Sequence, residues 1–161
     1  MFHTQEHRKD RLKWPIQCIK HNAWLGHAYY FWYDYIDAVS WGVNSKKGTG
    51  KYEIYQAEID CENVMDTVFN EAYYNFWIKQ VEKVAEKLNS TLHGRKCTLR
   101  EINQYIKDKA DWNVVGILYQ DIPQSYNHSL VQDFFYRKRI QLAVFNMKIV
   151  SNFAHKYTGN C

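Results

Sequence analysis

The sequence contains no long apolar segment and no closely spaced cysteine pair. Its 161 residues include no run of about 18 apolar residues, so a membrane-spanning helix is not expected. The first ten residues, MFHTQEHRKD, are polar and charged and lack the apolar core of a signal peptide. None of the four cysteines stands at C-x-x-C spacing, which argues against a zinc knuckle. We therefore expect a reduced, cytoplasmic protein without a metal site.

Familiar catalytic and nucleotide-binding motifs are also missing. The chain has no G-x-G-x-x-G, H-E-x-x-H or G-x-S-x-G motif. The segment KKGTGK (46–51) departs from a phosphate-binding loop because Tyr52 follows where Ser or Thr is required. Its lysines can contact anions, although a solvated loop is the favoured interpretation. His3 and His7 are the one histidine pair at helical ligand spacing, and we do not expect them to bind metal.

Aromatic residues and a mild excess of positive charge are what the sequence does have. Aromatic side chains make up 17% of the chain, and their flat rings suit both a core and a stacking surface. The formal net charge is +4, which permits an anionic partner such as a nucleotide or RNA without requiring one. A chain of this length can bury a core without disulfides, so a single domain over residues 1–161 is expected.

The spacing of apolar residues indicates strands at both ends of the chain with helices between them, which is an α+β pattern. Strands are expected over residues 1–5, 28–33, 52–60, 139–146 and, as a strand or an extended tail, 148–157. Helices are expected in residues 6–13 up to Pro15, over 35–42 ended by Gly42, over 63–88 as one helix or two, and after Thr98. Thr98 and Glu101 form a capping box. Residues 114–120 fit a strand or the tail of a helix.

The segment WLGHAYYFW (24–32), followed by DAVSWG (37–42), resembles a known pattern. It is similar to the W-L-G-x-G-x-Y-F-W-E, then A-x-x-W-A, pattern of a bacterial branch of the ADP-ribosyltransferase fold, which also includes diphtheria-toxin-like and poly(ADP-ribose)-polymerase-like enzymes. The resemblance implies a split β-sheet with flanking helices that binds NAD in its cleft. The family signature is a His on the first strand, a Tyr on the second and usually a Glu near the end.

The resemblance implies roles for individual residues. Tyr30 matches the second-strand tyrosine that stacks on nicotinamide, and Ala28 stands where the family usually has Gly, which narrows the approach. His3 in MFHT matches the histidine that steadies the NAD ribose, with the backbone at Thr4 beside it for the nicotinamide amide. His21 is the rival for the motif histidine, although it lies too close to Tyr30 for a separate strand.

Two later segments continue the resemblance. YQAEIDCENVMD (55–66) resembles the next family strand, and its Asp60 and Asp66 are interpreted as structural. RIQLAVFNMKIVSNF (139–153) resembles the strand that begins with the catalytic Glu of polymerase-like relatives, and this register falls on Gln141. A glutamine forms hydrogen bonds but takes no proton at neutral pH. NAD binding can survive this replacement, whereas activation of a weak nucleophile needs another group. In the alternative interpretation the enzyme is degenerate and Gln141 only satisfies backbone groups.

Basic residues are candidates for the anionic parts of the ligands. The cations after His3 are expected near the NAD pyrophosphate or, alternatively, form a solvated charge run: Arg8, Lys9 and Arg11. The cations of FFYRKR (134–139) are expected to contact RNA, because the segment combines aromatic rings with positive charge: Arg137, Lys138 and Arg139.

The function implied by the resemblance is that of an enzyme, an NAD-dependent mono-ADP-ribosyltransferase toxin. Bacterial members of this size are often encoded with an antitoxin or used against phage, and one resembling group, from toxin–antitoxin–chaperone phage-defence systems, modifies mRNA. The expected co-substrate is NAD and the expected acceptor is a base amine of RNA, with an antitoxin protein as a further partner. The alternatives are a protein acceptor, or an inactive module that binds NAD or RNA.

Overall fold

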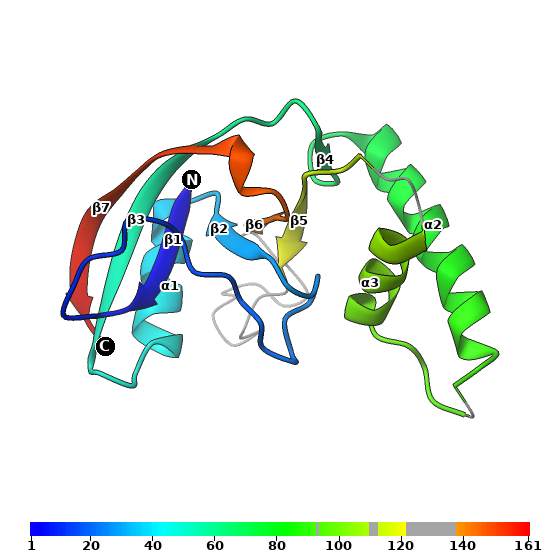
Figure 1. Ribbon diagram of the computed structural model, residues 1–161, viewed down its shortest axis with the longest axis horizontal. Helices are drawn as coiled ribbons and strands as arrows, with labels where there is room; N and C mark the ends of the chain where they lie inside the picture. The colour runs from blue at the N-terminus through cyan, green and yellow to red at the C-terminus, as the bar shows by residue number, and fades with distance from the viewer. Residues whose placement is uncertain (93, 110–112, 122–137) are drawn as a thin grey trace, which may run out of the picture.

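Seven strands form one sheet in the part of the chain that the computed structural model describes, residues 1–92, 94–109, 113–121 and 138–161 (Figure 1). Their order across the sheet is β4-β5-β6-β2-β1-β3-β7. The strands are β1 (Phe2–Glu6), β2 (Tyr29–Trp32), β3 (Lys51–Ile59), β4 (Val64–Asp66), β5 (Gly116–Asp121), β6 (Arg139–Val144) and β7 (Val150–Asn160). The helices are α1 (Tyr35–Ser45), α2 (Glu71–Asn89), α3 (Leu99–Lys109) and a 3₁₀ turn at Met147–Ile149. The predicted α+β class is confirmed.

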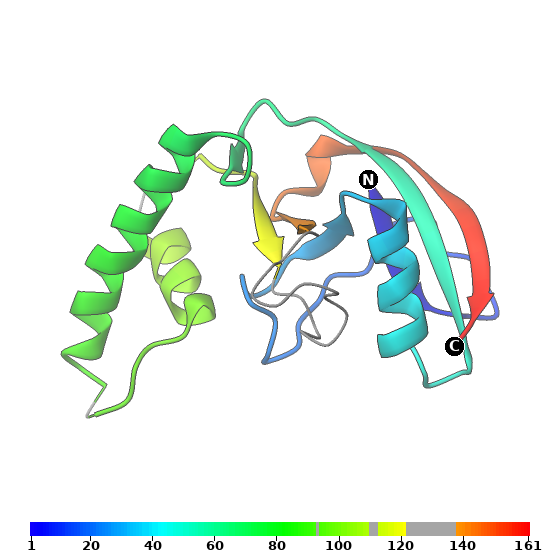
Figure 2. The same ribbon diagram turned by 180° about the vertical axis from the view of Figure 1, so that it is seen from behind.

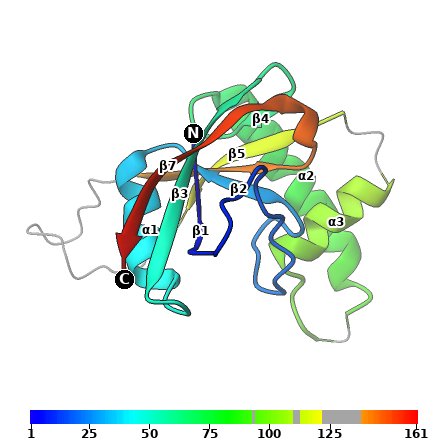
Figure 3. The same cartoon turned by 60° about the vertical axis from the view of Figure 1, so that its left-hand side comes forward.

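The central strand of the sheet, β2, and its neighbour β1 pair over a very short distance. The register between β1 and β2 consists of Phe2 opposite Trp32 within the described residues. In contrast, β1 pairs with β3 from Phe2 to Glu6, and β2 pairs with β6 from Tyr29 to Trp32. The sheet therefore separates at its middle into a half with β1, β3 and β7 and a half with β2, β6, β5 and β4 (Figure 3).

Each half of the sheet has its own helical layer. Helix α1 covers β1 and β3, and the view from behind shows it in front of them (Figure 2). Their shared core contains Trp32, Ala38, Tyr52 and Ile54. Helices α2 and α3 pack against each other at the far end of the molecule, beside β4 and β5. No helix in the described part of the chain has both the length and the apolar character needed to cross a bilayer.

Local sequence signals fix several element ends as predicted. The capping box of α3 is present, because the Glu101 carboxylate accepts from the Thr98 N–H at 2.8 Å and the Thr98 Oγ1 accepts from the Glu101 N–H at 3.2 Å. Asp66 Oδ1 accepts from the N–H groups of Val68 and Phe69, which confirms its structural role. In the turn that follows β3, Asp60 Oδ1 likewise accepts from the N–H of Glu62.

Two helix predictions were wrong: one helix is absent and the other begins later than expected. Residues 6–13 form no helix, because their backbone donors are used by β3: the His7 N–H donates to Lys51 O and the Leu12 N–H donates to the Tyr55 hydroxyl. The helix expected over 63–88 begins at Glu71 instead. The residues before it form β4, which pairs in parallel with β5, a long-range partner that helical spacing does not reveal. Predicted strands 28–33, 52–60, 139–146 and 148–157 are confirmed, and 114–120 overlaps β5.

Gly42 does not end α1, which continues to Ser45. Instead, Gly42 lets the helix approach β3, since a Cβ at this position would overlap the ring of Tyr52. We expect Gly42→Ala to lower the free energy of unfolding by about 1–3 kcal/mol, the usual effect of an overpacked core. Urea unfolding measures this, with Gly48→Ala as the matched control because its nearest neighbour would be 3.4 Å away. Equal stability of the two variants would contradict the packing role of Gly42.

Candidate functional site

A cavity of about 530 Å³ lies where β1 and β2 diverge. Its wall combines β1, β2, the end of α1, the segment 16–24, β5 and β6. Four residues proposed from the sequence line it together: His3, Thr4, Tyr30 and Gln141. Its volume falls within the range of about 300–1,000 Å³ usual for cofactor sites. Residues from opposite ends of the chain therefore share one concave site.

His3 is a buried link between three parts of this site. His3 is only 3% exposed. Burial lowers the pKa of its imidazole to about 4, so the ring is neutral at pH 7. Nδ1 lies 2.9 Å from the Tyr30 carbonyl oxygen, which assigns the ring proton to Nδ1. Nε2 then accepts from the Ile16 N–H at 3.2 Å and faces the Gln5 amide nitrogen at 3.2 Å. His21, the rival histidine, is exposed in the segment before β2 and lies outside the cavity wall.

The backbone of β1 has two edges with different partners. Residues in an antiparallel pair alternate in the direction of their N–H and C=O groups. The Met1 carbonyl accepts from the Ala57 N–H, and the His7 N–H donates to the Lys51 carbonyl. Odd-numbered residues of β1 therefore bond to β3, and even-numbered residues turn their backbone groups toward β2.

Thr4 is the first residue on that second edge after the strands separate. Phe2 stands opposite Trp32, and in a continuous sheet Thr4 would face Tyr30 next. The Tyr30 carbonyl is instead bonded by the ring of His3. The Thr4 N–H and C=O therefore face the cavity, as an adjacent donor and acceptor that match a primary carboxamide. The hydroxyl of Thr4 has another role, since it donates to the Ala38 carbonyl of α1 at 3.0 Å.

Tyr30 is fixed by hydrogen bonds at its far end. Its hydroxyl donates to the Gly26 carbonyl at 2.9 Å and accepts from the Leu25 N–H at 3.2 Å. Burial raises the pKa of Tyr30, so the hydroxyl stays protonated. Gly26 has φ of +79°, a conformation that favours glycine and turns its carbonyl toward Tyr30. Ala28, expected to narrow the approach, is fully buried in the core and lies outside the cavity wall.

Gln141 stands on β6 between Trp32 on one side and Tyr119 on the other. The Tyr119 hydroxyl donates to Gln141 Oε1, and burial holds the pKa of Tyr119 well above its ordinary value. With Oε1 accepting from Tyr119, the Nε2 end of the amide is the part that can reach a ligand. Gln141 is thus a fixed hydrogen-bond donor in this site.

Arg139 does not present a free cation to RNA. It is buried, its guanidinium bonds Asp121 Oδ2 at 3.1 Å, and it lies 4.8 Å from the centre of the Trp32 ring. Its Nε is a buried donor for which no partner is found among the described residues. Lys138 is exposed, and Arg137 lies outside the described residues. The expected basic patch is therefore reduced to Lys138 in the described chain, because the guanidinium of Arg139 is held by Asp121 and by the ring of Trp32.

The cations that reach the cavity are lysines, not the N-terminal residues expected near the pyrophosphate. Arg11, with Arg8 and Lys9, is exposed and lies outside the cavity wall, whereas Lys20 and Lys46 line it. Burial lowers the pKa of Lys46, and the nearby charge of Lys20 lowers it further. A bound anion would relieve this repulsion. Lys46 was a candidate anion contact in the sequence, but no local signal linked Lys20 to the site.

Two further lining residues, Trp24 and Asp121, were given no role in the site from the sequence. Trp24 is 39% exposed at the cavity, with its ring 6.2 Å from that of Tyr119. Asp121 lines the cavity from the end of β5. Both lie about 20 or more residues from Gln141 in sequence, so only the folded sheet brings them into one site with it.

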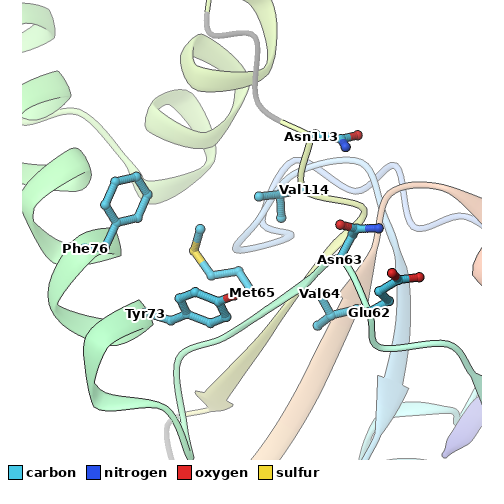
Figure 4. Close-up of a pocket in the computed structure, with 8 residues that line it drawn as sticks. All are labelled: Glu62, Asn63, Val64, Met65, Tyr73, Phe76, Asn113 and Val114. Carbon is cyan, nitrogen blue, oxygen red and sulfur yellow. The ribbon is translucent and has the colours of Figure 1, made fainter.

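A second cavity, of about 430 Å³, lies between α2 and β4 (Figure 4). Tyr73 and Phe76 extend from α2 on one side, and Asn63 and Asn113 lie across from them. Val64, Met65, Glu62 and Val114 complete its lining. None of these lining residues is a cation, so this cavity does not match a phosphate-bearing ligand, and none of the residues proposed from the sequence lies there.

The described residues contain no group of three or more His, Cys, Asp or Glu side chains placed to hold a metal ion. All four cysteines are unpaired. Comparison of the chain with protein-family models, with curated proteins and with solved structures found no match.

Proposed function

We propose that this protein is an NAD-dependent mono-ADP-ribosyltransferase with an ADP-ribosyltransferase-like split sheet. The main support is one observation: His3, Thr4, Tyr30 and Gln141 line a single cavity at the point where β1 and β2 diverge. The resemblance of residues 24–42 implies this arrangement of a first-strand His, a second-strand Tyr and a late polar residue.

The proposed NAD pose follows from the chemistry of the lining. The nicotinamide carboxamide bonds the N–H and C=O of Thr4, and its ring stacks on Tyr30. Lys20 and Lys46 neutralise the pyrophosphate. Gln141 donates to a hydroxyl of the nicotinamide ribose. In the described structure Nε2 of His3 already faces the Ile16 N–H and the Gln5 amide, so it can bond the ribose only by giving up one of them. The main role of His3 is therefore to bond the Tyr30 carbonyl and so keep β1 and β2 apart.

The reaction transfers ADP-ribose from C1′ of the nicotinamide ribose to a nucleophile. The C1′–N bond breaks through an oxocarbenium-like state, and the electron pair leaves with nicotinamide. NAD supplies the leaving group, and the protein supplies orientation. We propose a base amine of RNA as the acceptor, because it needs less base catalysis than a hydroxyl and Gln141 is no base. Exposed Trp24 beside the cavity suits stacking of an unpaired base.

Transfer of label from adenylate-labelled NAD into a cell lysate, separated into RNA and protein, tests this function. We expect label in RNA. Label in protein alone would keep the chemistry and replace the acceptor. No label in either fraction, with NAD binding retained, would instead support the inactive binding module that the Gln141 replacement suggests. The proposal as a bacterial toxin with an antitoxin partner predicts growth arrest on expression, relieved by the partner.

Lys20 and Lys46 provide a direct test of the NAD pose. Replacing both with alanine is expected to weaken NAD binding about 10-fold or more, because hydrogen bonds to charged groups contribute about 1.5–3 kcal/mol each. Titration calorimetry of the purified protein measures this effect. Lys9→Ala with Arg11→Ala is the matched control, since both residues are exposed outside the cavity wall. A larger loss of NAD affinity in the control variant would show that the N-terminal cations, and not Lys20 and Lys46, bind the pyrophosphate.

A further inference from the structure

Gln141 leaves the proposed reaction without a proton acceptor on β6. Its amide oxygen accepts from Tyr119, and its amide nitrogen can only donate. A nucleophile that attacks through an O–H or N–H bond must release a proton as the new bond forms. The cavity therefore needs another group that can receive it.

Asp121 is the carboxylate that lines this cavity. On β5 and β6, Tyr119 stands opposite Gln141 and Asp121 opposite Arg139. Side chains two residues apart on a strand point to the same face, so Asp121 and Gln141 are diagonal neighbours on the cavity side. Such neighbours lie roughly 7–8 Å apart between Cα atoms, within reach of one small molecule held between the two side chains.

The neighbours of Asp121 hold its carboxylate in a defined direction. Arg139 Nη2 donates to Oδ2 at 3.1 Å, and the guanidinium is itself fixed against the ring of Trp32 at 4.8 Å. The Asp121 side chain remains 20% exposed. A carboxylate that an ion pair orients and that is still 20% exposed is suited to a group that meets substrate.

We propose that Asp121 accepts the proton of the attacking nucleophile and so supplies the function that β6 lacks. This inference rests on the proposed NAD-dependent function. With water as the nucleophile, its oxygen forms a bond to C1′ of the ribose and the C1′–N bond breaks. That electron pair leaves with nicotinamide, and the water proton moves to the Asp121 carboxylate and then to solvent. The products are ADP-ribose and nicotinamide.

The test follows release of nicotinamide from NAD by the purified full-length protein, with water as acceptor. Asp121→Asn keeps the shape and can still accept from Arg139, but it takes no proton. We expect it to lower kcat about 100-fold or more, the usual contribution of a general base, with the NAD dissociation constant changed less than threefold. Asp108→Asn is the matched control, because Asp108 bonds Gln104 on the exposed face of α3.

A second variant separates chemistry from structure. Gln141→Glu places a carboxylate on β6, so Asp121→Asn combined with Gln141→Glu is expected to recover at least 10-fold of the lost kcat. Recovery of kcat supports the proton-acceptor role, because a new carboxylate at position 141 on β6 would not correct a structural defect caused by the change at Asp121. The inference is overturned if Asp121→Asn keeps more than half of the wild-type kcat, if it loses NAD binding in parallel, or if no recovery follows. Absence of NAD binding and turnover in the wild type would instead overturn the proposed function.

Discussion

Replacement of Tyr30 by alanine is expected to lower ADP-ribose transfer from NAD about 100-fold, the order of loss that follows a misplaced reacting group. The substitution removes the ring that faces the cavity. It also removes the hydroxyl that accepts from the Leu25 N–H and donates to the Gly26 carbonyl. These two hydrogen bonds fix the end of the segment that leads into β2 beside the site. Initial rates with adenylate-labelled NAD measure the effect.

Two variants divide this loss into its parts. Tyr30→Phe keeps the ring and removes both hydrogen bonds, so it should fall between the wild type and Tyr30→Ala. Tyr33→Ala is the matched control, because Tyr33 lies just beyond β2, is exposed and contacts Phe69 rather than the cavity. Full transfer by Tyr30→Ala would remove the stacking role from the proposal.

The second large effect concerns His3 and the dependence of stability on pH. Burial lowers the pKa of His3 from 6.5 to about 4, so the folded state binds this proton less readily than the unfolded state. The stabilising contribution is fully present above pH 6.5 and is lost as the pH falls toward 4. At pH 4 this loss amounts to about 3 kcal/mol.

Urea unfolding at pH 7 and pH 4 measures this contribution. His3→Gln retains a donor and an acceptor but does not titrate, so its stability should change less between the two pH values than that of the wild type. His21→Gln is the matched control, since His21 is exposed. An equal acid-induced loss in the wild type and in His3→Gln would show that protonation of His3 does not destabilise the fold.

The fold class and many of its elements could be predicted from the sequence. Alternation in residues 52–60 and 139–146 identified β3 and β6, and the Thr98–Glu101 pair identified the start of α3. These signals are local: a strand shows its two faces every second residue, and a cap joins residues three apart. The motif in residues 24–42 also directed attention to Tyr30, which lines the cavity.

The tertiary structure decided which of the candidates meet and in what state. Arg139 and Lys46 are both cations, but the β5–β6 pairing places Arg139 against Asp121, whereas Lys46 lines the cavity. His3 becomes neutral because three segments enclose it, a consequence of long-range packing. Asp121 and Gln141 become diagonal neighbours through the β5–β6 register, which no local spacing encodes. The sequence by itself therefore determined the elements and the candidate residues. The divergence of β1 from β2 in the folded sheet opened the cavity and determined which of these residues line it.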